Sequence, residues 1–316
     1  MSQSEARSLF ASRPAPQVAS IFTAVGGTPV VEIELFRERF PQAQVSLKLE
    51  YLNPGGSLKD RPVSRIILRA LQTGQLTSAK TILDSSSGNA GIAYALFGAA
   101  LGLRVTLVVP GNASAERLAR IRAHGATVIT TDPLEGYDEA IYTAQRLYHQ
   151  SPERYFYANQ YANENNWRAH YDTTAEEILA QAPGLTHFVA GVGTGGSLTG
   201  IARKLKERVP SVTIVAAAPE TFPGIEGLKP LADEEDYVPE IFDRSLVNRW
   251  VSVESSQARA FSHRLAREGI FAGHSTGAYL AAVEAILTDE PRARIVTLAC
   301  DTGERYLSAG LWEGRE

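Results

Sequence analysis

Cysteine is nearly absent from this chain of 316 residues, which contains Cys300 and no other. A single cysteine excludes an intrachain disulfide and a metal site built from several thiolates, and it suits a reducing compartment. His170 and His187 have no partners at metal-ligand spacing, so both are expected to be structural and no metal site is expected. Cys300 follows an apolar stretch, and we interpret it as a packed residue.

The chain also lacks long apolar runs and an excess of basic residues. No stretch approaches the roughly 18 apolar residues that a membrane-spanning helix needs, and the opening MSQSEARSLF does not resemble a secretory signal. The net charge is −4, which does not favour a surface for nucleic acid or anionic membrane. We therefore expect a cytoplasmic protein that binds neither.

The sequence does contain a regular alternation of short apolar segments and helical patterns. This alternation predicts an α/β fold of doubly wound, mostly parallel sheets, with ligands at the carboxyl ends of the strands. The length exceeds that of one compact core, so we expect two lobes with a cleft between them. The expected strands are 45–50, 81–84, 104–109, 126–130, 186–192, 212–218 and 294–299.

Residues 53–62, NPGGSLKDRP, place Lys59 in a glycine-containing turn before a helical pattern that starts near Pro62. Glycine lets a backbone turn tightly or approach a ligand closely, and proline is tolerated in a first helical turn. The same segment is also compatible with a polar turn that carries an ordinary surface lysine. Taken alone, it leaves both interpretations open.

Residues 84–95, DSSSGNAGIAYA, concentrate hydroxyl groups where a strand gives way to a helix. A helix start can bind an anion through its N–H groups and the helix dipole. Simple capping needs one serine, whereas this segment has three, followed by glycine and asparagine. The pattern is equally compatible with an anion site and with a capped helix packed closely on a sheet.

Residues 191–200, GVGTGGSLTG, form a glycine-rich turn between an apolar strand and a helix. Backbone N–H groups bind phosphate in such turns. The turn also satisfies G-x-G-x-x-G, and Glu220 stands near the position of a ribose-binding acid. The turn alone is therefore also compatible with a nucleotide-dependent oxidoreductase, whereas a Walker motif is excluded because no G-K-[ST] follows.

Together these stretches resemble the cysteine synthase family, the β-replacing pyridoxal-phosphate (PLP) enzymes of fold type II. The resemblance runs from GGTPVVEIE to GERYLS and includes HYDTTAEEI and GIFAGHSTGA. It implies an active site in the cleft, a smaller mobile domain over 51–160 that binds the substrate carboxylate, and a larger domain over 161–316 that binds the cofactor phosphate. Residues 1–50 are expected to pack largely with the larger domain.

The resemblance also implies roles for individual residues. Lys59 would form the imine with PLP, Asn89 would hydrogen-bond the ring hydroxyl, and Thr302 would stand where the family has a serine beside the pyridine nitrogen. The implied ligands of the cofactor phosphate are Gly193, Thr194, Gly195, Gly196 and Ser197. The implied ligands of the substrate carboxylate are Ser86, Ser87, Gly88 and Gln160. Ala90 departs from the family's usual threonine, which puts substrate affinity in question rather than reaction type.

The implied activity is synthesis of L-cysteine from an activated serine by way of an aminoacrylate, in a homodimer that takes a small amino acid as substrate. The stretches THFVAGVGT and EGIFAGHSTGA resemble the subgroup that uses O-phosphoserine rather than O-acetylserine. Lys229 is the only Lys or Arg between Glu220 and Asp243, and it is the candidate cation for a substrate phosphate or, equally, a surface lysine among acidic neighbours. Sulfide and a thiocarboxylate on a small carrier protein both stay open as donors.

Three other functions stay open as well. A PLP-dependent serine/threonine dehydratase or another β-replacing synthase would share the fold, but Asp60 after the lysine and Gly91 after Asn89-Ala90 look more like cysteine synthases. A non-catalytic protein of the same fold would not need Lys59, Asn89 and the phosphate loop. A nucleotide-dependent oxidoreductase, the most remote alternative, would leave NPGGSLKDRP and SSSGNAG unexplained.

Overall fold

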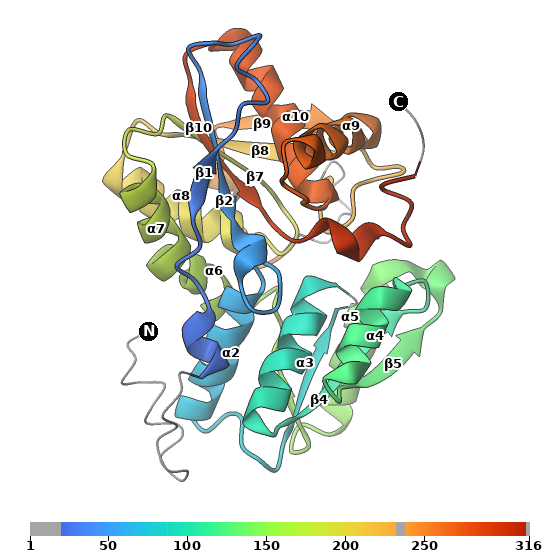
Figure 1. Cartoon of the computed structure of the whole chain (residues 1–316). Coiled ribbons are helices and arrows are strands. Elements are labelled where there is room, and N and C mark those ends of the chain that lie inside the picture. The colour runs from blue at the N-terminus through green and yellow to red at the C-terminus, as the bar shows by residue number, and fades with distance from the viewer. Residues whose placement is uncertain (1–19, 87, 232–237, 314–316) are drawn as a thin grey trace. The chain divides into compact units, whose positions relative to one another are not determined.

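The computed structural model of the chain describes residues 20–86, 88–231 and 238–313, which form two compact units. The small unit contains the described residues up to Gly27 and the stretch Asn53–Asn165, and the large unit contains Thr28–Leu52 and the residues from Asn166 on (Figure 1). The chain therefore passes from one unit to the other after Gly27, after Leu52 and after Asn165.

The small unit is built on a parallel four-stranded sheet in the order β5-β4-β3-β6. Its strands are β3 (Thr81–Ser85), β4 (Arg104–Pro110), β5 (Thr127–Thr131) and β6 (Tyr155–Tyr157). Its helices are α2 (Asp60–Gln72), α3 (Asn89–Leu101), α4 (Ala115–Ala123) and α5 (Gly136–Gln150).

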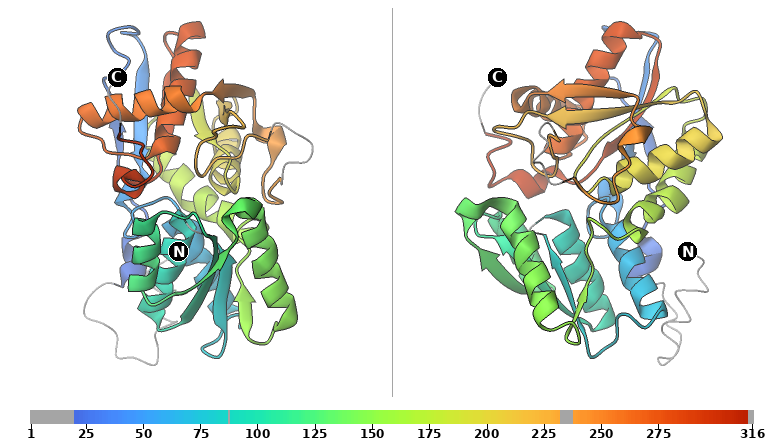
Figure 2. Two further views of the ribbon diagram at one scale, coloured as in Figure 1. Left: turned by 90° about the vertical axis from the view of Figure 1, so that its right-hand side faces the viewer. Right: turned by 180° about the vertical axis from the view of Figure 1, so that it is seen from behind.

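Two apolar clusters cover the two faces of this sheet, because successive residues of a strand point to opposite sides. Ile82 packs with Ile66 of α2 and Phe97 of α3, whereas its neighbour Leu83 packs with Ala140 of α5. Helices α2 to α4 accordingly lie on one face and α5 on the other (Figure 2).

The large unit is built on a six-stranded sheet in the order β1-β2-β10-β7-β8-β9, parallel except for β1. Its strands are β1 (Val30–Glu32), β2 (Gln44–Leu49), β7 (His187–Gly191), β8 (Thr213–Pro219), β9 (Arg249–Val253) and β10 (Arg294–Ala299). After α6 (Asn165–Ala169) and a π-helical turn over His170–Thr174, α7 (Ala175–Gln181) and α8 (Gly196–Arg208) cover one face. Helices α9 (Ser255–Arg267) and α10 (His274–Asp289) cover the other (Figure 1).

The predicted α/β class with mostly parallel sheets is confirmed, and each of the seven expected strands corresponds to a strand of the structure. Strands β1, β6 and β9 were not predicted. Two of them have three residues each, too few to show a period of two in the sequence. Within the described ranges, no helix is long and apolar enough to cross a membrane.

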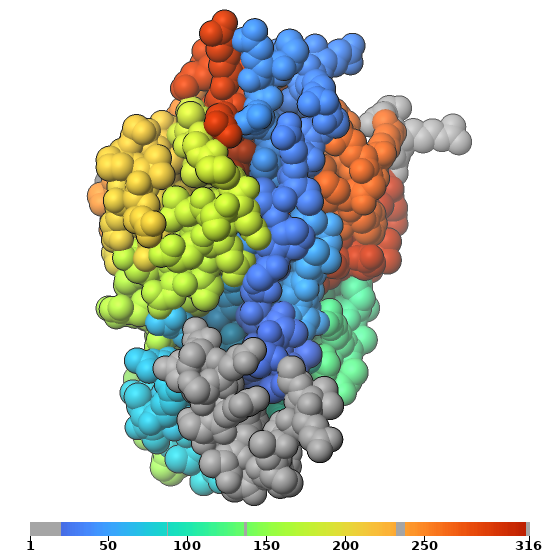
Figure 3. Space-filling view, turned by 60° about the vertical axis from the view of Figure 1, so that its left-hand side comes forward, coloured from blue at the N-terminus to red at the C-terminus, as the bar shows by residue number. Residues whose placement is uncertain are grey.

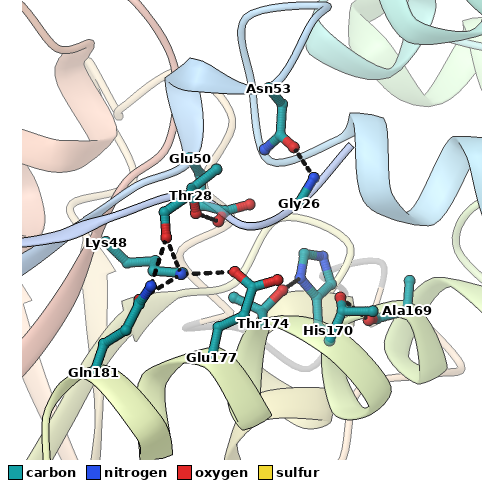
Figure 4. A network of polar contacts seen from close by, with 11 residues as sticks. Gly26, Thr28, Lys48, Glu50, Asn53, Ala169, His170, Thr174, Glu177 and Gln181 are labelled. Atoms are coloured by element: carbon teal, nitrogen blue, oxygen red, sulfur yellow. Dashed lines mark hydrogen bonds and ion pairs between the residues drawn. The ribbon is translucent and has the colours of Figure 1, made fainter. Parts of the chain in front are cut away.

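A buried lysine fastens β2 to α7. Lys48 is fully buried, and its ammonium lies 2.6 Å from Glu177 Oε2 and donates to Gln181 Oε1 at 2.8 Å and to the Thr28 carbonyl (Figure 4). The Thr28 hydroxyl in turn donates to the buried carboxylate of Glu50 at 2.7 Å. In the space-filling view the blue β1–β2 segment lies beside the yellow-green α7 segment, as these contacts require (Figure 3).

We predict that Glu177→Ala lowers the free energy of unfolding by about 3 kcal/mol, because it leaves the buried Lys48 ammonium without its carboxylate. Glu284→Ala is the matched control, since Glu284 pairs with Arg39 on the surface and exposed pairs contribute less than about 1 kcal/mol. Urea unfolding followed by circular dichroism measures both. Equal losses in the two variants would contradict the structural role of Lys48.

Candidate active site

In each sheet, the direction in which successive strands are added reverses once. In the small unit the chain runs from β3 to β4 to β5 and then places β6 on the other side of β3. In the large unit it runs from β7 to β8 to β9 and then places β10 on the other side of β7. Open α/β sheets bind ligands at such points, beyond the carboxyl ends of the strands. Most of the residues selected from the sequence follow these strands.

A turn of small polar residues lies at the reversal in the small unit. Strand β3 ends at Ser85, and Gly88 is the N-cap of α3, with its N–H directed to Ser86 Oγ at 3.3 Å. Gln160 follows β6 and donates from Nε2 to the Ser85 carbonyl at 3.0 Å. The structure therefore brings Gln160 onto the turn that carries Ser86, Gly88 and Asn89, whereas Ser87 lies outside the described residues.

Helix α3 is packed tightly against this turn. A Cβ on Gly91 would lie 2.2 Å from the Ser86 carbonyl oxygen, so only glycine allows the first helical turn to approach so closely. The N–H groups of a first helical turn have no carbonyl partner inside the helix. Those of α3 begin at Asn89, and together with the Ser86 hydroxyl and the Gln160 amide they suit a carboxylate.

A buried carboxylate lies beneath the same turn. Asp84 is fully buried and accepts hydrogen bonds from the backbone N–H of Ser85 at 2.9 Å and of Gln160 at 3.3 Å. Burial raises the pKa of the Asp84 carboxyl to about 7, although hydrogen bonds from Tyr94, Ser85 and Gln160 act in the opposite direction. Sequence analysis missed Asp84. The available signal was an acidic residue at the end of the apolar run TILD.

Lys59 directly precedes α2 as its N-cap residue and is half-buried. The turn before it is closed by Asp60, whose carboxylate accepts the Gly55 N–H. A Cβ on Gly55 would lie 2.3 Å from Asp60 Oδ1, which explains the glycine. The Lys59 N–H is directed to Ser57 Oγ at 3.2 Å. The residues around the lysine thus fix its backbone position.

The glycine-rich loop of the large unit is packed so closely that side chains are excluded at three positions. Gly195 has φ +80°, and a Cβ there would lie 2.6 Å from Phe242 Cβ. On Gly196 it would lie 2.0 Å from Asn166 Oδ1, and on Gly193 2.4 Å from the Gly227 carbonyl oxygen. Ser197 follows in the first turn of α8. Such a loop, leading into a helix of thirteen residues, suits a phosphate.

A side-chain hydrogen bond holds this loop to α6. Asn166 is buried and donates from Nδ2 to Thr194 Oγ1 at 3.1 Å. The same hydroxyl lies 3.4 Å from the Gly196 nitrogen, which donates to it. The Thr194 hydroxyl is therefore buried and hydrogen-bonded to its own surroundings. The hydrogen-bond donors that the loop can offer to a ligand are mainly its backbone N–H groups.

Thr302 follows β10, the strand beside β7, so it leaves the sheet next to the glycine-rich loop. It is paired with Ala272 in an isolated bridge. The next residue, Gly303, donates its N–H to the Phe271 carbonyl at 3.0 Å and accepts from Trp312 Nε1 at 2.8 Å. Trp312, which sequence analysis did not select, stacks on Phe271 with centroids 4.3 Å apart and so helps to position Thr302.

Lys229 lies beside the same loop. Its backbone N–H donates to the Val192 carbonyl at 2.7 Å, directly before Gly193, and its side chain is half-buried. The segment Ile225–Lys229 therefore packs on the start of the glycine-rich loop, as the contact between Gly227 and Gly193 also shows.

Glu220, the ribose-binding acid of the oxidoreductase hypothesis, has a structural partner. Its carboxylate accepts the Ser255 N–H at 2.7 Å at the first residue of α9. Across the residues that the structure describes, no group of three His, Cys, Asp or Glu side chains is placed to hold a metal ion.

Comparison with known proteins agrees with this geometry. A family model described as pyridoxal-phosphate-dependent enzyme matches residues 21–301. A cysteine synthase from Aquifex aeolicus is 41% identical over 306 residues, which cover 94% of this chain and 93% of that protein.

Solved structures give the same result. A cysteine synthase from Entamoeba histolytica has a TM-score of 0.87 and 32% identity, covering 96% of this chain and 94% of its own. An O-ureido-L-serine synthase has a TM-score of 0.87 and 37% identity, covering 95% of this chain and 97% of its own. With the family model and the relatives in agreement, the chain belongs to the pyridoxal-phosphate-dependent enzymes, and among them to the cysteine synthase family.

Proposed function

We propose that this enzyme replaces the β-substituent of an activated L-serine with a sulfur nucleophile and so forms L-cysteine. The observation that carries the proposal is the reversal point of the small unit, where the Ser86 hydroxyl, the α3 start and the Gln160 amide meet. These groups suit the carboxylate of an amino acid. The names of the relatives support the same chemistry, since the Aquifex aeolicus protein is a cysteine synthase.

The residues of the chain fit the cofactor of this family. The loop Gly193–Ser197 offers backbone N–H groups without side chains to block a phosphate, and Lys59 supplies an amine on a fixed backbone. When bound, PLP supplies an electron sink for the loss of the α-proton and the β-substituent. We propose that Lys59 attaches to its aldehyde, Asn89 hydrogen-bonds its ring hydroxyl, and Thr302 pairs with its ring nitrogen.

Lys59 has a second role in this proposal. With the cofactor and an amino acid bound, the Lys59 amine would be placed to accept the α-proton as a general base.

Thr302 favours elimination over transamination, because a neutral hydroxyl stabilises positive charge at a ring nitrogen less than a carboxylate does. The adjacent carboxylate of Asp301 is buried and accepts from the Tyr306 hydroxyl at 2.8 Å. This contact supports the assignment of the role to Thr302 rather than to Asp301.

Ala90 contributes packing at the carboxylate turn. It is buried and belongs to the apolar cluster that includes Ile92 and Ala93. The family's threonine hydroxyl is missing at this position. We infer that carboxylate binding depends correspondingly more on Ser86, the N–H groups of the α3 start and Gln160.

We further propose O-phosphoserine as the activated substrate and Lys229 as the cation that binds its phosphate. The Ile225–Lys229 segment packs on the start of the glycine-rich loop, and the half-buried lysine is less screened by solvent than an exposed one. Sulfide is the simplest sulfur donor compatible with this reaction.

We predict that Lys59→Ala abolishes covalent attachment of PLP. Borohydride reduction followed by mass spectrometry should find no cofactor fixed to the variant, because no other amine would occupy the same position. Lys80→Ala removes a lysine of the same unit that is outside the candidate site and should leave attachment unchanged. A cofactor fixed to another lysine in Lys59→Ala would refute the assignment.

Gly195→Ala should weaken PLP binding at least about tenfold, because the new Cβ would overlap Phe242 and disturb the loop. Gly269→Ala is the control for backbone strain alone, since Gly269 also has a positive φ (+86°) but has no atom within 4 Å of a Cβ. Equilibrium titration of each apoprotein with PLP, followed by visible absorbance, gives the dissociation constants. Similar affinities in both variants would remove the loop from the phosphate site.

Lys229→Ala should lower kcat/KM for O-phosphoserine about tenfold or more, because a hydrogen bond to a charged group contributes about 1.5–3 kcal/mol. The reaction with O-acetylserine should stay nearly unchanged. Lys206→Ala, on α8, is the matched control. L-cysteine formed from each substrate with sulfide is the measurement, and equal losses on both substrates, or none on either, would reject the phosphate role.

A further inference from the structure

Asp84 is an unusual residue to find fully buried. Its carboxylate lies at the carboxyl end of β3, and the groups that donate hydrogen bonds to it are two neutral backbone N–H groups, those of Ser85 and Gln160. Burying a carboxylate with neutral partners is costly compared with an apolar side chain of similar volume. The position therefore calls for a reason beyond packing.

The hydrogen bonds of Asp84 close a ring across the reversal point. Its Oδ1 accepts from Ser85 N at 2.9 Å and its Oδ2 from Gln160 N at 3.3 Å. Gln160 completes the ring by donating from Nε2 to the Ser85 carbonyl at 3.0 Å. The one side chain thus joins the end of β3 to the loop that follows β6.

The backbone turns sharply just before Gln160. Asn159 has φ +46°, a left-handed conformation that asparagine adopts more readily than most residues with a side chain. The Asn159 carbonyl accepts from Ala162 N at 3.1 Å and from Asn163 N at 2.9 Å, so the chain turns sharply at this point. Asp84 accepts the N–H of the next residue, Gln160, and so helps to set the direction in which the chain leaves the turn.

We propose that Asp84 is a positioning residue that sets the affinity for the substrate carboxylate by holding Gln160 against the serine turn. The inference rests on the proposed role of that turn in binding an amino acid. Asp84 does not contact the substrate. It acts through Gln160, whose amide carries two N–H groups, one of which is directed to Ser85. Loss of the Asp84 contact would release the Gln160 backbone N–H and so shift the point from which the side-chain amide reaches the Ser85 carbonyl.

The test compares Asp84→Asn with the parent holoenzyme. The new amide keeps the volume and one acceptor but presents N–H to one of the two backbone donors. We expect KM for the activated serine to rise about tenfold, kcat to change by less than about threefold, and the PLP dissociation constant to stay the same. Asp132→Asn is the matched control, because that exposed carboxylate also accepts a backbone N–H, from Leu134 at 2.9 Å.

A double-mutant cycle separates positioning from a general structural effect. In a Gln160→Ala background, Asp84→Asn should raise KM by less than about twofold, because the residue through which it acts is gone. Independent, multiplying losses would overturn the proposal, as would an unchanged KM or a fall in kcat alone. If Asp84→Asn does not fold, Asp84→Glu replaces it in the same cycle. It keeps the carboxylate but displaces it by one methylene from the two N–H groups, and should also raise KM only when Gln160 is present.

Binding of L-alanine distinguishes this inference from the proposed function. L-alanine has the carboxylate but no β-leaving group, and calorimetry on the holoenzyme measures its affinity without turnover. Asp84→Asn should weaken L-alanine binding about tenfold even if neither activated serine yields L-cysteine, an outcome that would refute the proposed reaction alone. Equal L-alanine affinity in parent and variant would refute the role of Asp84 alone.

Discussion

Parallel pairing of neighbouring strands is the constraint on which the rest of the structure depends. It forces the carboxyl ends of β3 and β6 to one edge of the small sheet, and those of β10 and β7 to one edge of the large sheet. The strand order reverses at these two pairs, so the loops that leave them diverge and expose backbone N–H groups. The serine turn and the glycine-rich loop lie where that exposure occurs.

Parallel pairing also determines the position of β2, which pairs with β10 and is held against α7 by the buried Lys48. This strand lies between the two sequence segments of the small unit, yet it pairs with β10 near the end of the chain. Lys59 follows its last residue, Leu49, by ten residues. The Lys48 ammonium, held by Glu177 and the Thr28 carbonyl, fixes the strand against α7.

Much of this organisation could be predicted from local sequence. The apolar runs indicated the long strands because a buried parallel strand has little polar interruption, and the turn around Gly195 was recognisable from its glycines. What could not be predicted depends on contacts between distant segments. Strand β6 is only three residues long, and without it no local pattern, only the family resemblance, places Gln160 beside the serine turn. The importance of Asp84 follows only from that placement.

Three buried carboxylates of the described residues lie beside proposed functional groups. Asp60 holds the Gly55 N–H before Lys59, Asp84 holds the Gln160 N–H, and Asp301 accepts from Tyr306 beside Thr302. The regular hydrogen bonds of a helix or strand end where a loop begins, so the N–H groups of the loop need other acceptors. A buried carboxylate can be such an acceptor, because an unpaired N–H would be costly to bury. Asp60 and Asp84 therefore stabilise a non-repetitive backbone next to a proposed functional group. The free-energy cost of burying Asp60 and Asp84 is offset in part by the backbone N–H groups that donate to them.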